Sequence, residues 1–309
     1  MTYLSLRILK DGFHKSLMDL IMPDNFTFKI RPMITNDLNQ AFSLSNSEGW
    51  NQTEKDWKLL VENPLNICIV AEYNNKVIGT ATALNHSNKV AWIGMVLVDK
   101  SFRGRGVGRM LLTNIIGALK IVDSIKLDAT PTGLPLYQKL GFIEEYKIYR
   151  MINPSSQSLE KQSFNYEPVN INQESFSDVL KLDKKIFGTA RTYLLQTLLR
   201  NYPGKAYLIK RNKKLDGYMF GRDGVRFNYI GPVFAFSHDS ARILISKALE
   251  SLNNQPVALD ILQDKEGLFK WLEMLGFVKQ RHFIRMSFKN NSYHGLIKYQ
   301  YLISGPEFG

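Results

Sequence analysis

Residues 98–112 read VDKSFRGRGVGRMLL and are the most informative stretch of the sequence for the fold. Three glycines and three arginines lie between Arg103 and Arg109, and apolar residues at helical spacing follow. Glycines allow consecutive backbone N–H groups to approach phosphate oxygens closely, and the N-terminus of a following helix adds positive potential. The stretch therefore indicates either a site for a pyrophosphate group or a flexible basic turn ahead of a helix.

Two common phosphate-binding motifs do not fit these glycines. Rossmann dinucleotide sites carry the pattern G-x-G-x-x-G, whereas the glycines here stand at positions 104, 106 and 108. A Walker P-loop requires a Gly-Lys-Ser/Thr sequence, which the stretch does not contain. The glycine spacing therefore disfavours a Rossmann site, and the missing Gly-Lys-Ser/Thr sequence excludes a Walker P-loop.

The sequence on both sides of this loop predicts alternating strands and helices. We expect strands at 26–31, 89–98, 125–128 and 142–150, a hairpin at 66–84, and helices at 36–45, 53–62, from the loop to 121, and at 134–140. This order gives an antiparallel meander followed by a β-loop-helix-β unit, whose right-handed crossover makes its two strands parallel. The predicted class is α/β, with an α+β mixed sheet.

Two phrases of the sequence occur twice. LGFIEEYKIYRM (140–151) matches LGFVKQRHFIRM (275–286) at Leu, Gly, Phe, Arg and Met without a gap. IVAEYNNKVIG (69–79) resembles YLIKRNKKLDG (207–217), and both read as a hairpin. Because the two repeats occur in the same order and at nearly the same offset, they indicate two duplicated domains.

The polar stretch 151–175 contains two prolines and has no periodicity, which is typical of a linker. We therefore predict an N-terminal extension at 1–25, a first domain at 26–151, a linker at 152–171 and a second domain at 172–309. Residues 1–22 have apolar residues at helical spacing from Leu6 to Leu20. They predict an amphipathic helix, or else a tail that precedes a native start at Met22 or later.

The composition limits the function classes. The net charge is +12, but the basic residues are dispersed, so we expect no nucleic-acid partner. No apolar run reaches the roughly 18 residues of a membrane span, and we expect a cytoplasmic protein without membrane contact. Cys68 is the lone cysteine and is expected to be a buried strand thiol without an intramolecular disulfide.

Two motifs at their usual separation carry a family resemblance. Arg103-x-x-Gly106-x-Gly108 follows a strand that ends MVLV, and PLYQKLGF (135–142) comes some thirty residues later. Together they resemble the GNAT superfamily of acetyl-coenzyme A-dependent N-acetyltransferases.

Three further stretches resemble one subgroup of that superfamily. EGWNQTEKDW (48–57) and LDATPTGLPLYQKLGF (127–142) are similar to the first domain of bacterial tandem GNAT proteins. The second half of those proteins is a divergent acetyltransferase-like domain, and the closing ISGPEFG (303–309) fits the same group. The resemblance covers nearly the whole chain and implies two tandem GNAT-like folds.

The resemblance implies acetyl-coenzyme A as cosubstrate and no metal. In that family the glycine loop holds the coenzyme pyrophosphate, and the preceding strand splays at a bulge. The freed backbone groups of the strand pair with the pantetheine arm, and one N–H polarises the thioester carbonyl. The residues that would bind the cofactor are Met95, Val96, Leu97, Val98, Arg103, Gly104, Arg105, Gly106, Val107 and Gly108.

Tyr137 stands where the family usually has the general acid that protonates the leaving thiolate. Its other interpretation is packing, since Leu136 and Leu140 lie beside it on the predicted helix. The general base is left open among three carboxylates, and each of them also fits a structural role. The three are Glu48, Glu72 and Asp128.

The acceptor pocket has two candidate residues, Trp50 and Asn51, which also fit packing and a helix N-cap. The second copy has no equivalent of the coenzyme site. Leu272 aligns with Tyr137, and the glycines of the loop have no counterparts there. His238 and Asp239 lie at that turn; we interpret them as the start of a helix, with a second active site as the alternative.

The sequence thus predicts a transfer of acetyl from acetyl-coenzyme A to a primary amine by direct attack, catalysed by the N-terminal domain. The sequence does not name the acceptor and leaves four classes open: a polyamine, an amino acid, an aminoglycoside and a protein amine. The alternative is a non-catalytic protein that binds and senses acyl-coenzyme A.

Overall fold

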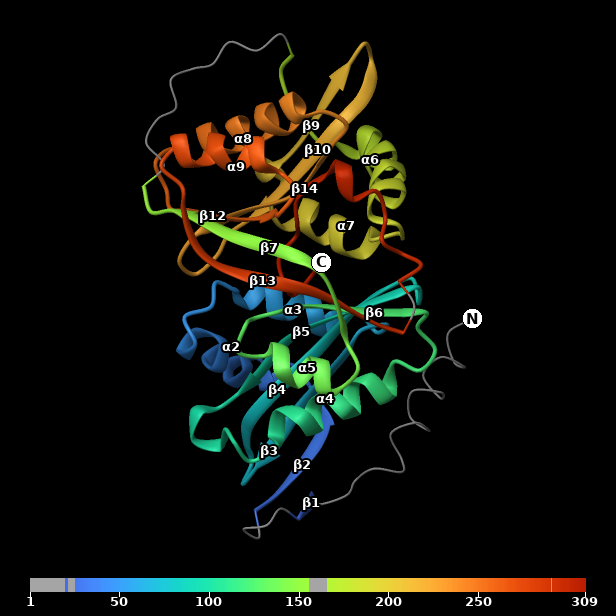
Figure 1. The fold of residues 1–309 in the computed structure, drawn as a ribbon, viewed down its shortest axis with the longest axis vertical. Coiled ribbons are helices and arrows are strands. Elements are labelled where there is room, and N and C mark those ends of the chain that lie inside the picture. The colour runs from blue at the N-terminus through green and yellow to red at the C-terminus, as the bar shows by residue number, and fades with distance from the viewer. Residues whose placement is uncertain (1–19, 22–25, 156–165, 290) are drawn as a thin grey trace. The chain divides into compact units, whose positions relative to one another are not determined.

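The computed structural model describes residues 20–21, 26–155, 166–289 and 291–309 (Figure 1). The predicted N-terminal helix lies outside these residues, except that Leu20–Ile21 form a short strand, β1, instead of a helical turn. Contacts divide the chain into two compact units. The first contains residues up to Leu84 and Met95–Ile121, and the second contains Asn85–Gly94 and Val122–Gly309.

The first unit begins with an antiparallel meander. Strand β1 pairs with β2, β2 with β3, and β3 with β4. The strands are β2 Thr27–Pro32, β3 Ile67–Tyr73, β4 Lys76–His86, which ends in the other unit, and the last residues of β5 Val90–Val98; the helices are α2 Leu38–Ser47, α3 Glu54–Glu62 and α4 Val107–Ala118. The predicted hairpin, both helices and the helix after the glycine loop are confirmed.

Local sequence explains where these elements begin and turn. Asn74 and Asn75 connect β3 to β4 with φ values of 47° and 60°, the left-handed pair that a two-residue hairpin turn requires. The Thr53 side chain accepts a hydrogen bond from the Asp56 amide, and the Asp56 carboxylate accepts one from the Thr53 amide. This capping box makes Thr53 the N-cap of α3, so the alternative interpretation of Asn51 as a helix N-cap is wrong.

Trp57 is the largest side chain in the core of the first unit. It is fully buried, and its indole Nε1 donates to the Ser45 Oγ on α2 at 3.2 Å. Apolar residues from α3, β3, β4 and α4 complete this core: Leu60, Val70, Ile78, Leu111, Leu112 and Ile115. Cys68 lies on strand β3, as expected, but the residue is half-buried and not fully buried. Desolvation of its thiol raises the pKa of Cys68 to about 12.

The second unit contains the remaining strands and helices. The strands are β6 Ser124–Ala129, β7 Ile143–Asn153, β8 Val169–Asn170, β9 Ala206–Arg211, β10 Lys214–Arg222, β11 Asn228–Ala235, β12 Val257–Leu262, β13 Val278–Lys289 and β14 Gln300–Leu302. The helices are α5 Leu134–Lys139, α6 Gln173–Phe187, α7 Thr192–Asn201, α8 His238–Leu252 and α9 Glu266–Met274.

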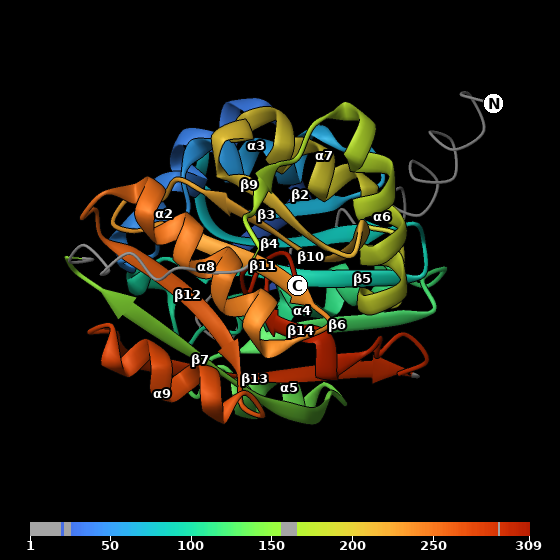
Figure 2. The same cartoon turned by 90° about the horizontal axis from the view of Figure 1, so that it is seen from above.

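The predicted repetition is visible in the strand pairing. Strands β5 and β6, which precede and follow α4 in the chain, pair in parallel. Strands β11 and β12, which precede and follow α8, also pair in parallel. The two sequence copies therefore have the same β-loop-helix-β topology, as expected. In the second unit α8 packs against β10 and β11 (Figure 2).

The two copies exchange the strands that follow their repeated LGF phrases, β7 and β13. Strand β13, from the second copy, pairs antiparallel with β6 of the first copy over residues 284–289. On its other side β13 pairs with β7, and β7 pairs in turn with β12 of the second copy. The order β6–β13–β7–β12 thus places β13 of the second copy beside β6 of the first, and β7 of the first copy beside β12 of the second.

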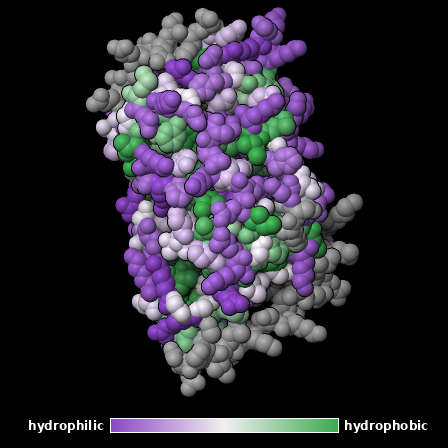
Figure 3. All heavy atoms as spheres, viewed as in Figure 1, coloured by the Kyte–Doolittle hydropathy of each residue, from purple (hydrophilic) through white to green (hydrophobic). Residues whose placement is uncertain are grey.

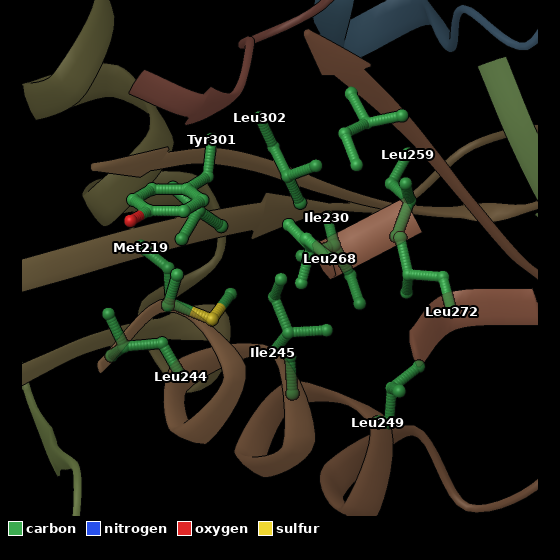
Figure 4. Close-up of a cluster of buried hydrophobic side chains, with 14 of the residues drawn as sticks. Met219, Ile230, Leu244, Ile245, Leu249, Leu259, Leu268, Leu272, Tyr301 and Leu302 are labelled. Carbon is green, nitrogen blue, oxygen red and sulfur yellow. The ribbon is translucent and has the colours of Figure 1, made fainter. Parts of the chain in front are cut away.

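A large apolar core lies between α8, α9 and the neighbouring strands (Figure 4). Leu272 on α9 is fully buried in it, in the same cluster as side chains from α8 such as Leu244 and Ile245. The position that aligns with Tyr137 therefore serves packing in the second copy.

In the described part of the chain, no helix is both long and apolar enough to cross a membrane. The face in Figure 3 shows apolar residues scattered among hydrophilic ones.

Candidate functional site

The glycine loop has the backbone conformation that only glycine adopts easily. Gly104 and Gly106 both have φ values of +76°, in the left-handed region that is costly for other residues. A side chain on Gly104 would meet no atom within 4 Å, so conformation rather than space calls for glycine there. Gly106 is the N-cap residue of α4. The glycines therefore let the chain turn from the end of β5 into the first turn of α4.

The loop presents backbone N–H groups at the N-terminus of α4. Met110 is the first residue whose amide donates to the backbone of the helix, to the Gly106 carbonyl at 3.0 Å. Within the described residues, the amides from Gly104 to Arg109 have no hydrogen-bond acceptor. Since Gly104 and Arg105 are exposed, these amides and the positive end of α4 form a preformed anion site.

The arginines of the loop are held by neighbours in the first unit. Arg103 pairs with Glu48 at 2.6 Å, and its Nε donates to the Val98 carbonyl at 3.1 Å. The Arg105 guanidinium lies over the Phe26 ring, 5.3 Å from its centroid. Glu48, one of the candidate bases, therefore positions an arginine of the loop.

Strand β5 has an irregularity just before the loop. Met95 has a φ of +50°, which is unusual for a residue with a side chain, and its carbonyl accepts a hydrogen bond from Thr80 Oγ1 at 2.7 Å. Beyond it, Val96 and Val98 are half-buried while Leu97 is buried. Parallel pairing of β5 with β6 covers only Val90–Ile93. The break in regular strand geometry thus falls in the segment where the family resemblance implies a bulge.

Tyr137 lies on α5 in the second unit. Its ring packs edge-on against Phe142, 6.0 Å between centroids, and a side chain at Gly133 would come within 2.9 Å of it. Burial raises the pKa of Tyr137 to about 12, so the phenol stays protonated near neutral pH. Within the described residues its hydroxyl has no hydrogen-bond partner, which leaves that proton available. Tyr137 therefore packs against Phe142 and also has a hydroxyl group that donates to none of the described residues.

The other two carboxylate candidates are both engaged in ion pairs. The side chain of Asp128 is fully buried, and its two oxygens accept from Nε and Nη2 of Arg285 at 2.9 and 3.0 Å. Burial raises the pKa of Asp128 despite this pairing. Glu72 faces Lys29 at 2.6 Å and Arg31 at 2.5 Å, and the hydrogen bond from Lys29 is the main cause of its lowered pKa.

The two acceptor-pocket candidates lie in the turn between α2 and α3. The Trp50 amide donates to the Ser45 carbonyl at 3.0 Å, and the ring is half-buried. Asn51 is buried and is not without an interaction partner. The next residue, Gln52, is also buried, and its Oε1 has no hydrogen-bond partner among the described residues. Sequence reasoning missed Gln52, because a glutamine in a turn carries no signal of burial.

The corresponding turn of the second copy contains side chains instead of open amides. Ser237 caps α8 by accepting from the Ser240 amide at 3.2 Å. The Asp216 carboxylate accepts from Ser240 Oγ at 2.5 Å and thus adds negative charge beside the helix N-terminus. His238 is partly buried, which lowers its pKa, and it begins the helix as expected. In the described residues no group of three or more potential metal ligands occurs.

Comparison with known proteins gives matches over both copies. The acetyltransferase (GNAT) family model matches residues 31–142, and an acetyltransferase (GNAT) domain model matches residues 179–302. The chain is 31% identical over 189 residues to the uncharacterized N-acetyltransferase YitH of Bacillus subtilis, covering 60% of this chain and 66% of that protein. It is 24% identical over 216 residues to holothin acyltransferase of Pseudoalteromonas sp., covering 69% and 71%.

A solved structure has the same fold over most of the chain. The crystal structure of a putative acetyltransferase from Pyrococcus horikoshii superposes with a TM-score of 0.75 at 23% identity. The match covers 91% of this chain and 96% of that one. Both copies, including the second one without a glycine loop, therefore fall within the matched fold.

Proposed function

Because the chain belongs to the GNAT acetyltransferases, a family of acyltransferases, and carries two GNAT domains in tandem, we propose that it transfers acetyl from acetyl-coenzyme A to a primary amine. The observation that carries this proposal is the loop from Gly104 to Arg109. Its amides have no acceptor in the described part of the chain and stand at the N-terminus of α4. That arrangement suits the pyrophosphate of coenzyme A.

The residues present fit this cosubstrate. The loop amides would bind the pyrophosphate, and Arg103 and Arg105 would add positive charge at its rim. The backbone of β5 from Met95 to Val98 would pair with the pantetheine arm, and one of its N–H groups would polarise the thioester carbonyl. None of these roles needs a metal ion, because backbone dipoles supply the charge stabilisation.

The transfer itself balances with one proton donor. The amine nitrogen bonds to the thioester carbon, the carbon–sulfur bond breaks, and the sulfur takes a proton from the Tyr137 hydroxyl. The amine loses its proton as the amide forms, and a second proton is released because the amine starts as an ammonium ion. Tyr137 suits this role because its raised pKa keeps it protonated near neutral pH.

We assign the catalysis to the N-terminal copy. The second copy has a carboxylate, Asp216, beside the capped start of α8, which would repel a pyrophosphate. It also has the buried Leu272 at the position of Tyr137, and a leucine donates no proton. We therefore propose that coenzyme A binds the full chain at one site.

The experiment measures binding and turnover separately on the full chain. Isothermal titration with coenzyme A is expected to give one site per chain. Release of free thiol from acetyl-coenzyme A, followed with a thiol reagent, is expected to require an amine from a panel of spermidine, L-lysine, D-glucosamine and a short peptide with a free N-terminus. Binding without amine-dependent release would favour the alternative, a non-catalytic acyl-coenzyme A sensor. Two binding sites would contradict the assignment to one copy.

A further inference from the structure

The residues from Ile303 to Gly309 fold into the interior of the second unit. Phe308 is fully buried, and its carbonyl lies 3.3 Å from the His86 Nε2. Trp92 on β5 donates from its indole Nε1 to the Pro306 carbonyl at 3.1 Å. These contacts place a segment from the second copy beside β5, which comes from the first copy.

Glu307, in the middle of this segment, is a buried carboxylate with one unused oxygen. Its exposed fraction is 3%, and its Oε1 accepts from Arg222 Nη2 at 2.6 Å. Its Oε2 is also buried, but no hydrogen-bond donor for it exists among the described residues. Because an ionised oxygen without a donor is costly in a protein interior, a missing partner is expected at Oε2.

Two other buried carboxylates of the second unit have donors for both oxygens. A third carboxylate, Glu145, also has a buried oxygen without a hydrogen-bond partner among the described residues, but Lys126 Nζ lies 3.3 Å from that Oε1. Asp260 accepts from Arg150 Nε and Nη2 and from the Tyr229 hydroxyl, so both its oxygens are occupied. Both oxygens of Asp128 are bonded to Arg285. In the ion pairs of Asp260 and Asp128, every carboxylate oxygen thus has a hydrogen-bond donor. In the pair of Glu307 with Arg222, one carboxylate oxygen has none among the described residues.

The position of Glu307 connects it to the proposed reaction. A side chain at Gly94 would come within 2.7 Å of the Glu307 Cα, so the backbone of Glu307 lies directly on β5 at Gly94. Gly94 immediately precedes Met95, where β5 leaves regular strand geometry. In the proposed function the thioester carbonyl pairs with β5 from Met95 onward.

We propose that Glu307 binds the ammonium group of the acceptor through Oε2 and takes its proton before attack. The ammonium loses one proton to Oε2, and the resulting neutral amine forms the bond to the thioester carbon. The second proton that nitrogen must lose is balanced by the proton that sulfur gains. An ammonium group suits Oε2 because a carboxylate oxygen only accepts hydrogen bonds, and a positively charged donor forms the stronger bond with it. The inference rests on the proposed function and adds the acceptor-binding residue to it.

The test compares two variants of Glu307 with a matched control. Glu307→Gln keeps the size of the side chain and an oxygen for Arg222 but removes the charge. We expect its KM for the best amine of the panel to rise at least tenfold and kcat/KM to fall at least 100-fold. The dissociation constant of coenzyme A, measured by titration, is expected to stay within threefold. Glu307→Asp, which keeps the charge, is expected to restore part of the lost kcat/KM.

Asp260→Asn is the control, because it removes a buried carboxylate that pairs with arginine but has no unused oxygen. A purely structural role for Glu307 would give both variants the same pattern, a lower melting temperature with an unchanged KM for amine. Glu307→Gln with native melting and an amine KM within threefold of the parent would overturn the inference and leave the proposed function standing. Absence of amine-dependent thiol release by the parent protein would overturn both.

If Glu307→Gln does not fold, the parent protein still decides the question. Spermidine is expected to raise its melting temperature in the presence of coenzyme A, and 1,8-octanediol, which has no charge, is expected to leave it unchanged. An equal effect of the two compounds would contradict an ammonium site at a carboxylate.

Discussion

Arg150 and Asp260 form a two-pronged ion pair in the interior of the second unit, with Nε–Oδ1 at 2.8 Å and Nη2–Oδ2 at 2.6 Å. Arg150 belongs to the last strand of the first copy, and Asp260 belongs to β12 of the second. The two residues are direct register partners in the β7–β12 pairing. The pair therefore fixes the exchanged strand in its register, because a shift would leave two charges buried without partners.

Asp260→Asn is expected to destabilise the protein strongly. Arg150 would remain buried with a neutral partner, and breaking such a pair costs about 3–5 kcal/mol. The double variant Arg150→Met with Asp260→Leu is expected to lose less, since it removes both charges together. Chemical denaturation of the parent, both single variants and the double variant gives the coupling energy. A loss below about 1 kcal/mol in Asp260→Asn, the range of an exposed pair, would contradict the register role.

Gly106→Ala is expected to weaken coenzyme A binding at least tenfold. The φ of +76° at this position costs about 1–2 kcal/mol for a residue with a side chain, so the loop would relax away from the geometry that aims its amides. Gly117→Ala on the same helix α4 is the matched control, because a side chain there meets no atom within 4 Å. Titration with coenzyme A checks both variants. Equal affinities would mean that the loop is only a turn.

Tyr137→Phe is expected to lower kcat about 100-fold and leave coenzyme A binding unchanged, because it removes only the proton donor. Burial raises the pKa of Tyr137 to about 12, so the parent enzyme is expected to keep its kcat as the pH rises through the ordinary tyrosine value of about 10. Tyr149→Phe, at another half-buried tyrosine, is the control. A decline of kcat with a midpoint near pH 10, absent in Tyr137→Phe, would contradict the raised pKa.

His86 is expected to contribute to acid destabilisation. Burial lowers its pKa from 6.5 to about 3, so the folded protein holds it neutral while the unfolded chain protonates it below about pH 6.5. Stability from this group is therefore complete above pH 6.5 and is lost as the pH falls toward 3. At pH 5 the loss is about 2 kcal/mol, at 1.4 kcal/mol per pH unit.

The check is the free energy of unfolding of His86→Gln between pH 7 and pH 4, compared with the parent. The variant is expected to be less dependent on pH over this range, even if it is less stable at pH 7. His294→Gln, at an exposed histidine, is expected to follow the parent. Parallel pH profiles of His86→Gln and the parent would refute the role of His86.

The elements that were predicted correctly from the sequence are those whose formation depends on residues close together in the chain. The turn at Asn74–Asn75, the helix that begins after Gly106 and the duplicated β-loop-helix-β order all follow from local propensity and periodicity. The alternative role of Asn51 as a helix N-cap was wrong, because several turn residues near the start of α3 can cap a helix and the structure uses Thr53.

The partners of the candidate carboxylates could not be predicted. Asp128 is paired with Arg285, 157 residues away in the chain, and Glu72 is paired with Lys29 and Arg31 from another strand. Whether a carboxylate is free to act as a base depends on such partners, and no local pattern encodes them. Glu307 was missed for the same reason, since its burial beside Gly94 depends on the path of the last seven residues.

The sequence by itself was enough to identify the family, the duplication and the loop that would bind coenzyme A. Glycine positions and apolar periodicity are properties of residues that are close together in the chain. The tertiary structure decided that β13 lies between β6 and β7, and that Arg150 meets Asp260 across the exchanged strands. Two copies with the same strand pattern offer equivalent partners to β7 and β13. The choice between them is made by packing and buried charge over the whole sheet, which only the folded chain brings together.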